Sequence, residues 1–274
     1  DIIWVVDESG STDTHRTNIV NNANAFFSRA LASGLDFRMG VTSMAPNGKG
    51  IFCSDGTGAQ NDTSPGSDRF LRPDEQKAFS DCIKNPPGYD VSTENGLTNA
   101  REAVLQHLPR APDAPNKIRV GAKLVIILVT DEGPSETSSI EGTFSSTCQL
   151  SASKQSQFAT ALQPHLDLYK GVTDPDGAAQ YHVIGGVCNN SCGAGIAHGY
   201  RELAQQLSGQ IGDICQKDLG NTLQVIIDSI AGIASPVDLT FVPVASSLAV
   251  AVDGVEVPRS RTAGFDYRAE PNKL

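Results

Sequence analysis

The chain has 274 residues, with 21 lysines and arginines against 31 aspartates and glutamates, so its formal net charge is −10. This acidic balance argues against non-specific binding to nucleic acid and against docking on an anionic membrane surface. Hydrophobic residues make up 39% of the chain, which is enough for one large core. No apolar run approaches the roughly 20 residues that a membrane span needs.

The first half of the chain alternates strand and helix patterns. It opens on IIWVV, a run of β-branched and aromatic residues that is typical of a strand covered on both faces. In chain order we expect a strand at 2–6, a helix at 15–35, a strand at 36–44, a short helix at 73–85 with Pro73 at its first position, and an amphipathic helix at 96–108. Residues 45–90 are dense in glycine, proline and small polar residues, which indicates a long excursion.

The second half continues the alternation after its most apolar segment, AKLVIILVTDE at 122–132, which predicts a central buried strand. A serine- and glycine-rich loop follows at 133–153. Beyond it we expect a helix at 154–169, a strand at 180–187, a helix at 200–209, a short edge strand at 211–215 and a last long helix at 219–233.

These patterns predict an α/β fold for residues 1–235, with a doubly wound, mostly parallel sheet, helices on both faces and insertions at 45–90 and 133–153. Residues 236–274 predict a small β-rich C-terminal segment, in which VDGVEV carries the Asp-Gly signal of a two-residue hairpin. Because residue 1 already opens a core strand, we expect the chain to be a processed or trimmed one.

Oxygen-bearing side chains follow two of the predicted strands and precede one helix. Asp7, Ser9 and Ser11 come directly after the first strand, Thr93 stands before the helix at 96–108, and Asp131 lies at the tip of the central strand. The carboxyl ends of parallel strands meet at one edge of a sheet, where α/β proteins bind ligands. Mg²⁺ takes six oxygens near octahedral geometry, so these five side chains from three loops predict a site for Mg²⁺, or for Mn²⁺ or Ca²⁺.

The same residues carry a resemblance to the von Willebrand factor type A domain family. The motifs are DESGS at 7–11, Thr93, and TDE at 130–132, which the resemblance places after the fourth strand. In that family these positions form the metal-ion-dependent adhesion site. The resemblance implies that Ser9, Ser11 and Thr93 coordinate a metal through their hydroxyls, while Asp7 and Asp131 act directly or through bound water. We expect the flanking Glu8 and Glu132 to face bound water or solvent.

The resemblance covers residues 1 to about 235, and the two insertions and the cysteines resemble secreted or surface-anchored bacterial members. The tail resembles a small β-module that follows such domains in bacterial lipoproteins. The resemblance implies an extracytoplasmic, metal-dependent adhesion domain. With two carboxylate ligands the metal keeps an open position, which an Asp or Glu carboxylate of a protein or cell-surface ligand fills.

Two other classes of function stay open. One is an envelope assembly or scaffold protein whose metal is structural only. The other is a hydrolase, which the residues favour less: none of the five histidines joins a Ser/Asp motif, and DESGS is not a G-x-S-x-G elbow. The expectation is therefore a binding domain and not an enzyme.

Six cysteines lie in or beside polar, glycine-rich segments, and neither paired CxxC motifs nor histidines at ligand spacing suggest zinc. Disulfides, and hence an oxidising compartment, are the better interpretation. Cys53 and Cys82 bracket one excursion and are expected to pair. Cys148, Cys188, Cys192 and Cys215 are expected to pair among themselves, although six cysteines allow fifteen connectivities.

Overall fold

The computed structural model describes residues 1–53, 68–88, 93–112, 114–172, 178–234, 243, 247–252, 255–259, 265 and 267. The chain divides into two compact units, Asp1–Ala231 and Gly232–Leu274. Within the described residues, no helix combines the length and the apolar character that a membrane crossing needs.

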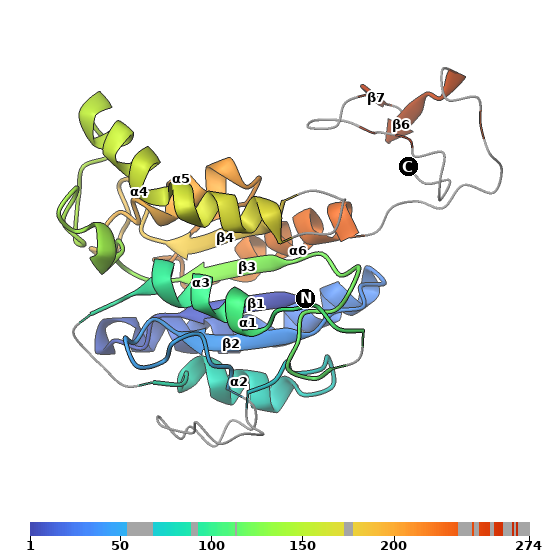
Figure 1. Ribbon diagram of the computed structural model, residues 1–274, viewed down its shortest axis with the longest axis horizontal. Helices are drawn as coiled ribbons and strands as arrows, with labels where there is room; N and C mark the ends of the chain where they lie inside the picture. The colour runs from blue at the N-terminus through green and yellow to red at the C-terminus, as the bar shows by residue number, and fades with distance from the viewer. Residues whose placement is uncertain are drawn as a thin grey trace. The chain divides into compact units, whose positions relative to one another are not determined.

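A five-stranded, all-parallel sheet in the order β2-β1-β3-β4-β5 forms the centre of the first unit (Figure 1). Its strands are β1 (Ile2–Val6), β2 (Met39–Ser43), β3 (Val125–Val129), β4 (Gln180–Gly185) and β5 (Ile211–Asp213). The helices are α1 (Asp13–Ala32), α2 (Gln76–Lys84), α3 (Gly96–Gln106), α4 (Ala152–Gly171), α5 (Tyr200–Gln206) and α6 (Gly220–Ala234), with 3-10 turns η1 (Gly10–Thr12) and η2 (Ser135–Thr137). The predicted α/β class is confirmed.

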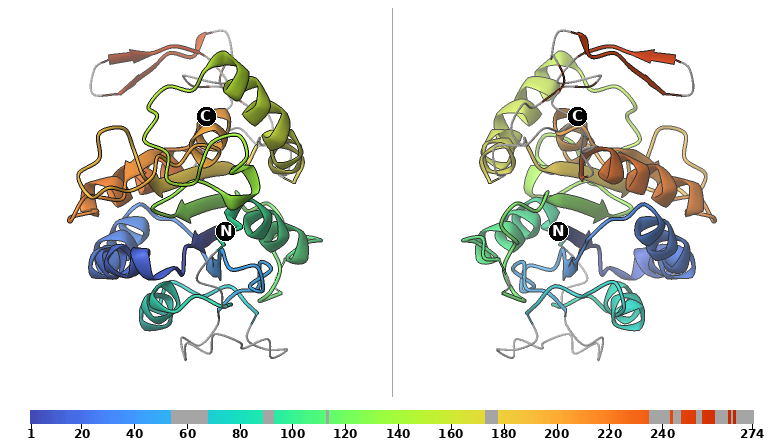
Figure 2. Two further views of the ribbon diagram at one scale, coloured as in Figure 1. Left: turned by 90° about the vertical axis from the view of Figure 1, so that its left-hand side faces the viewer. Right: turned by 90° about the vertical axis from the view of Figure 1, so that its right-hand side faces the viewer.

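Alternate residues of the central strands enter two separate hydrophobic cores, as the two-residue period of a strand requires. Trp4 faces the core shared with α1, α2 and α6, and its ring packs edge-on against Phe26 and Phe79 at centroid distances of 5.5 and 5.3 Å. Ile3 and Val5 face the core shared with α3, α4 and α5. Figure 2 shows α1 and α6 on one side of the sheet and α3 and α4 on the other. Burial on both faces explains why β1 and β3 are apolar throughout.

Several expected boundaries are wrong in detail. Pro73 lies in a turn, and α2 begins three residues later at Gln76, with Glu75 as its N-cap. The strands predicted at 36–44 and 122–132 are five residues each in the structure. The segment Thr130–Glu132 follows the third strand in chain order and not the fourth, because the described residues between 45 and 90 pair with the sheet only through an isolated antiparallel bridge from Leu71 to Met39.

Two disulfides join loops of the first unit. Cys53 pairs with Cys82, as expected from the excursion that they bracket, and Cys192 pairs with Cys215, within the group predicted to pair among itself. Cys148 and Cys188 are thiols in the structure.

The second unit contains the predicted hairpin. Strands β6 (Val250–Val252) and β7 (Val255–Val257) pair antiparallel, with Val252 opposite Val255. The turn residues 253 and 254, most of the strand-like segment at 238–244 and most of that at 264–272 lie outside the described residues.

His182 on β4 is fully buried and must be neutral. Its Nδ1 accepts the Gln210 N–H at 2.9 Å, and its Nε2 lies 3.1 Å from Gln180 Oε1. Burial lowers the pKa of His182 from 6.5 to about 4. We expect its contribution to stability to be complete above pH 6.5 and to be lost as the pH falls toward 4, because only the unfolded chain takes up the proton in that window. The loss is about 3 kcal/mol.

The measurement is the free energy of unfolding in urea between pH 7 and 4, for the wild type and for His182→Gln. The variant is expected to show a flatter pH dependence, whatever its absolute stability. Parallel curves for the two proteins would contradict the assignment.

Candidate metal centre

The site begins with a fully buried carboxylate at the end of β1. The Asp7 N–H donates to Val129 O on β3 at 2.9 Å, which continues the sheet pairing one residue beyond the strand. Asp7 Oδ1 accepts the Ser9 N–H at 2.8 Å, and Oδ2 accepts the Thr130 hydroxyl at 2.8 Å. Asp7 is thus fixed by its own loop and by the loop after β3.

A chain of short contacts links the predicted ligands of these two loops. Turn η1 brings Ser11 back toward Ser9, and their hydroxyl oxygens lie 2.8 Å apart. The Ser11 hydroxyl donates to Asp131 Oδ1 at 3.2 Å. Four of the five predicted ligands, Asp7, Ser9, Ser11 and Asp131, therefore form one cluster at the carboxyl edge of the sheet.

Thr93, the fifth, is half-buried and stands three residues before α3. The hydrogen bonds among the described residues do not connect it to the other four. Its neighbour Glu94 does tie this segment to the loop after β3: the Glu94 N–H donates to Ser135 Oγ at 3.1 Å, and Glu94 O accepts the Ser135 N–H at 3.1 Å.

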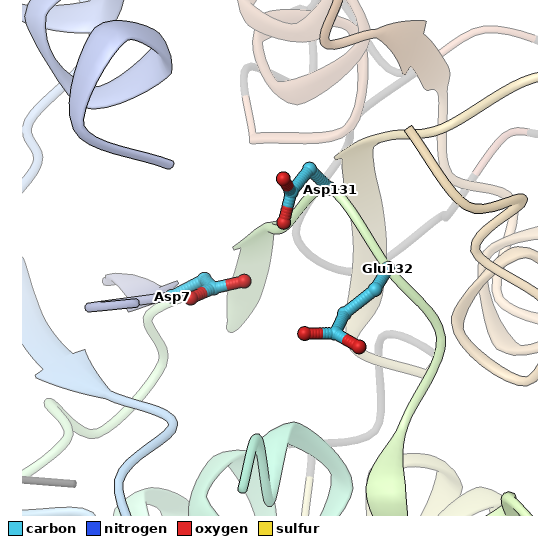
Figure 3. Close-up of side chains that lie close together, drawn as sticks. All are labelled: Asp7, Asp131 and Glu132. Atoms are coloured by element: carbon cyan, nitrogen blue, oxygen red, sulfur yellow. The ribbon is translucent and has the colours of Figure 1, made fainter. Parts of the chain in front are cut away.

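Glu132 contributes a third carboxylate; it is buried, so of the two expected placements, beside bound water or in solvent, the solvent one is wrong. Its side chain is 5% exposed, and oxygen atoms of Asp7, Asp131 and Glu132 all lie within 4.8 Å of one another. Figure 3 shows the three carboxylates pointing toward a common space. The Glu132 N–H donates to the Thr130 hydroxyl at 3.1 Å, so Thr130 orients both Asp7 and Glu132.

Two more glutamates approach this cluster. Glu94 is 4% exposed, and its carboxyl group lies close enough to Glu132 for the Glu132 charge to raise the pKa of Glu94. Glu8 Oε2 accepts the Met44 N–H at 3.1 Å, whereas Glu8 Oε1 is buried without a hydrogen-bond partner. The sequence patterns do not single out Glu94; its position directly after the predicted ligand Thr93 is the one signal they hold for it.

Burial and mutual repulsion dominate the electrostatics of the five carboxyl groups. Burial, then the charges of Glu132 and Asp7, raise the pKa of Glu94 to about 8, and burial raises the pKa of Glu8 to about 7. Burial also raises the pKa values of Asp131 and Glu132. In the described part of the chain, no ion pair reaches any of these five groups. Carboxylates and hydroxyls without a basic partner are a donor set that suits a hard divalent cation.

Arg16 on α1 stabilises the backbone of the loop that follows β1. Its Nη1 donates to the carbonyl oxygens of Asp7 and Ser9 at 2.6 and 3.0 Å, and the Thr12 hydroxyl reaches the same two oxygens at 2.9 and 2.8 Å. Arg16 is only 5% exposed. The sequence held a signal for it, because position 16 shares the apolar face of α1 with Ile19 and Ala23.

We expect Arg16→Met to lower the free energy of unfolding by about 2–3 kcal/mol, because two buried carbonyls lose a charged donor. Urea unfolding in the presence of a chelator measures the loss without a contribution from bound metal. The control is Arg29→Met on the same helix, whose ion pair with Asp228 is about half exposed and should cost less than about 1 kcal/mol. Equal losses in the two variants would show that Arg16 does not support the loop.

No protein-family model and no curated protein matches the sequence. Among solved structures, the chain is similar to the pilus adhesin SpaC from Lactobacillus rhamnosus GG in an open conformation, with a TM-score of 0.46 and 15% sequence identity. The match covers 85% of this chain and 30% of that one, so the chain spans less than a third of the adhesin's length.

Proposed function

We propose that this chain is a binding domain in which Asp7, Ser9, Ser11, Thr93 and Asp131 hold a divalent cation, Mg²⁺ or in its place Mn²⁺ or Ca²⁺. The observation that carries the proposal is the continuous chain of contacts from Asp7 through Ser9 and Ser11 to Asp131, which joins two loops at one sheet edge. Helix capping alone does not account for it, because neither Ser9 nor Thr12 makes a side-chain cap.

The residues present fit such an ion. Ser9, Ser11 and Thr93 offer hydroxyls, Asp7 and Asp131 offer carboxylates, and the unpartnered Glu8 Oε1 nearby would find a partner in metal-bound water. Glu132 adds a third buried carboxylate close to those of Asp7 and Asp131. A cation held this way supplies a Lewis-acidic position that a carboxylate from outside the protein can occupy.

We infer that the partner is a protein or cell-surface ligand that presents an Asp or Glu carboxylate, and that the chain works outside the cytoplasm. Two disulfides support an oxidising compartment, secreted or cell-surface anchored. The net charge of −10 disfavours nucleic acid as the partner. In this proposal the chain is a binding protein and not an enzyme. The alternative is a scaffold protein with a purely structural metal, and a ligand-binding experiment distinguishes the two.

The first experiment tests the cation. Asp7→Asn and Asp131→Asn are expected to abolish the binding of Mg²⁺ and Mn²⁺ in calorimetric titration. In a chelator, Asp131→Asn should unfold at or above the temperature of the wild type, because it removes one of several crowded carboxylates. Asp167→Asn, on the exposed face of α4, should leave both properties unchanged. Cation binding of wild-type strength in both site variants would refute the assignment.

The second experiment tests the open position. Acetate labelled with ¹³C is added to the Mn²⁺-loaded protein, and electron–nuclear double resonance measures the coupling between the manganese and the label. We expect a coupling typical of a carboxylate bound directly to the metal, and none with labelled acetamide, which carries no charge. If Mn²⁺ binds but acetate does not couple to it, the metal is structural and the adhesion proposal fails.

A further inference from the structure

Two loops lie against one another beside the carboxylate cluster. The first, 133–151, follows β3, and the second, 186–199, follows β4. The Ile196 N–H donates to Ser145 O at 2.7 Å, and His198 Nε2 is hydrogen-bonded to Thr147 O at 2.7 Å. The fit is close: a Cβ added to Gly195 would lie 2.5 Å from Thr143 O, so only glycine fits there.

This packing places the remaining two cysteines together. Cys188 Sγ lies 3.7 Å from the carbonyl oxygen of Cys148 and is hydrogen-bonded to it. The two thiols are also close enough for Cys188 to raise the pKa of the Cys148 thiol. Cys148 is exposed and Cys188 half-buried, so small reagents reach the pair. The other four cysteines are already paired, which leaves each of these thiols only the other as a partner within the chain.

We propose that Cys148 and Cys188 form a dithiol–disulfide site that reacts with low-molecular-weight disulfides, such as oxidised glutathione, and closes a third bridge between the two loops. The inference rests on the thiols alone and does not depend on the proposed cation site.

The reaction proceeds by two exchanges. One cysteine loses its proton to water, and its thiolate attacks a sulfur of the small disulfide; a mixed disulfide forms and one small thiolate leaves. The second cysteine, as thiolate, then attacks the cysteine sulfur of the mixed disulfide and displaces the other small thiolate. The two cysteines are oxidised by two electrons in all, the small disulfide is reduced to two thiols, and the released protons return to them. Because the thiolate is the nucleophile, the rate rises with pH.

Closing this bridge restrains the loop that directly follows the metal-facing residues Asp131 and Glu132. The Gly195 N–H donates to Asp131 O at 2.8 Å and the Ile196 N–H to Ser145 O at 2.7 Å, so backbone hydrogen bonds already join the two loops. A disulfide between Cys148 and Cys188 reduces the conformational entropy of the unfolded chain. It also opposes local opening of the two loops, which the hydrogen bonds alone permit.

Peptide mapping without reduction is the direct test. Cys148 linked to Cys188 is expected either in the protein as isolated or after incubation with oxidised glutathione. In Cys148→Ser and in Cys188→Ser, the remaining cysteine should instead hold one glutathione as a stable mixed disulfide, because no second thiol is present to displace it. Two unreacted thiols, two glutathione adducts, or links to Cys192 or Cys215 in the wild type would overturn the proposal.

Hydrogen exchange gives the structural readout. Oxidised wild type should protect residues 133–151 more than the Cys148→Ser/Cys188→Ser double variant does, while the two proteins exchange alike across α1 and α3. The double variant keeps the other two disulfides, so any difference belongs to this pair. If peptide mapping shows the bridge but residues 133–151 exchange equally fast in the two proteins, the bridge does not restrain this loop.

Discussion

The whole site depends on the need to solvate one carboxylate that has no access to water. Asp7 lies at the end of a strand buried on both faces, so its two oxygens must find donors within the protein. One donor comes from the backbone of its own loop and the other from Thr130 on the neighbouring strand end. Satisfying Asp7 therefore fixes the separation of the two loops, and with it the positions of the side chains that each loop presents.

The parallel topology supplies the rest of the arrangement. Strands β1 and β3 are neighbours in register from Ile2 and Val125 to Val6 and Val129, so both strands end at the same level. Residues more than a hundred positions apart, such as Ser11 and Asp131, meet because their strands end together. The adjacent end of β4 adds the second loop, whose backbone N–H groups donate to Asp131 O and Ser145 O.

Much of this was predictable from local sequence. The apolar runs of β1 and β3 and the apolar stripes of α1, α3 and α6 identify their elements, because burial on both faces or on one face leaves a clear period. The start of α2 was misplaced, since the favourable position of proline in a first turn is only a preference, and here Pro73 lies in a turn that precedes the helix. Asp7, Ser9, Ser11 and Asp131 were identifiable because they follow strands. Glu94 was not singled out, and Glu132 was not expected to be buried, because only the fold shows that both glutamates are enclosed beside Asp7.

Arg16 holds the first loop through the carbonyl oxygens of Asp7 and Ser9 and not through their side chains. Every residue type has a carbonyl, so the support from Arg16 does not depend on the side chains of the residues it holds. During evolution, substitutions at positions 9 and 11 can therefore alter which ion or ligand is selected while Arg16 and Asp7 keep the loop in place. Arg16 therefore stabilises the backbone of this loop independently of the side chains that the loop presents to a ligand.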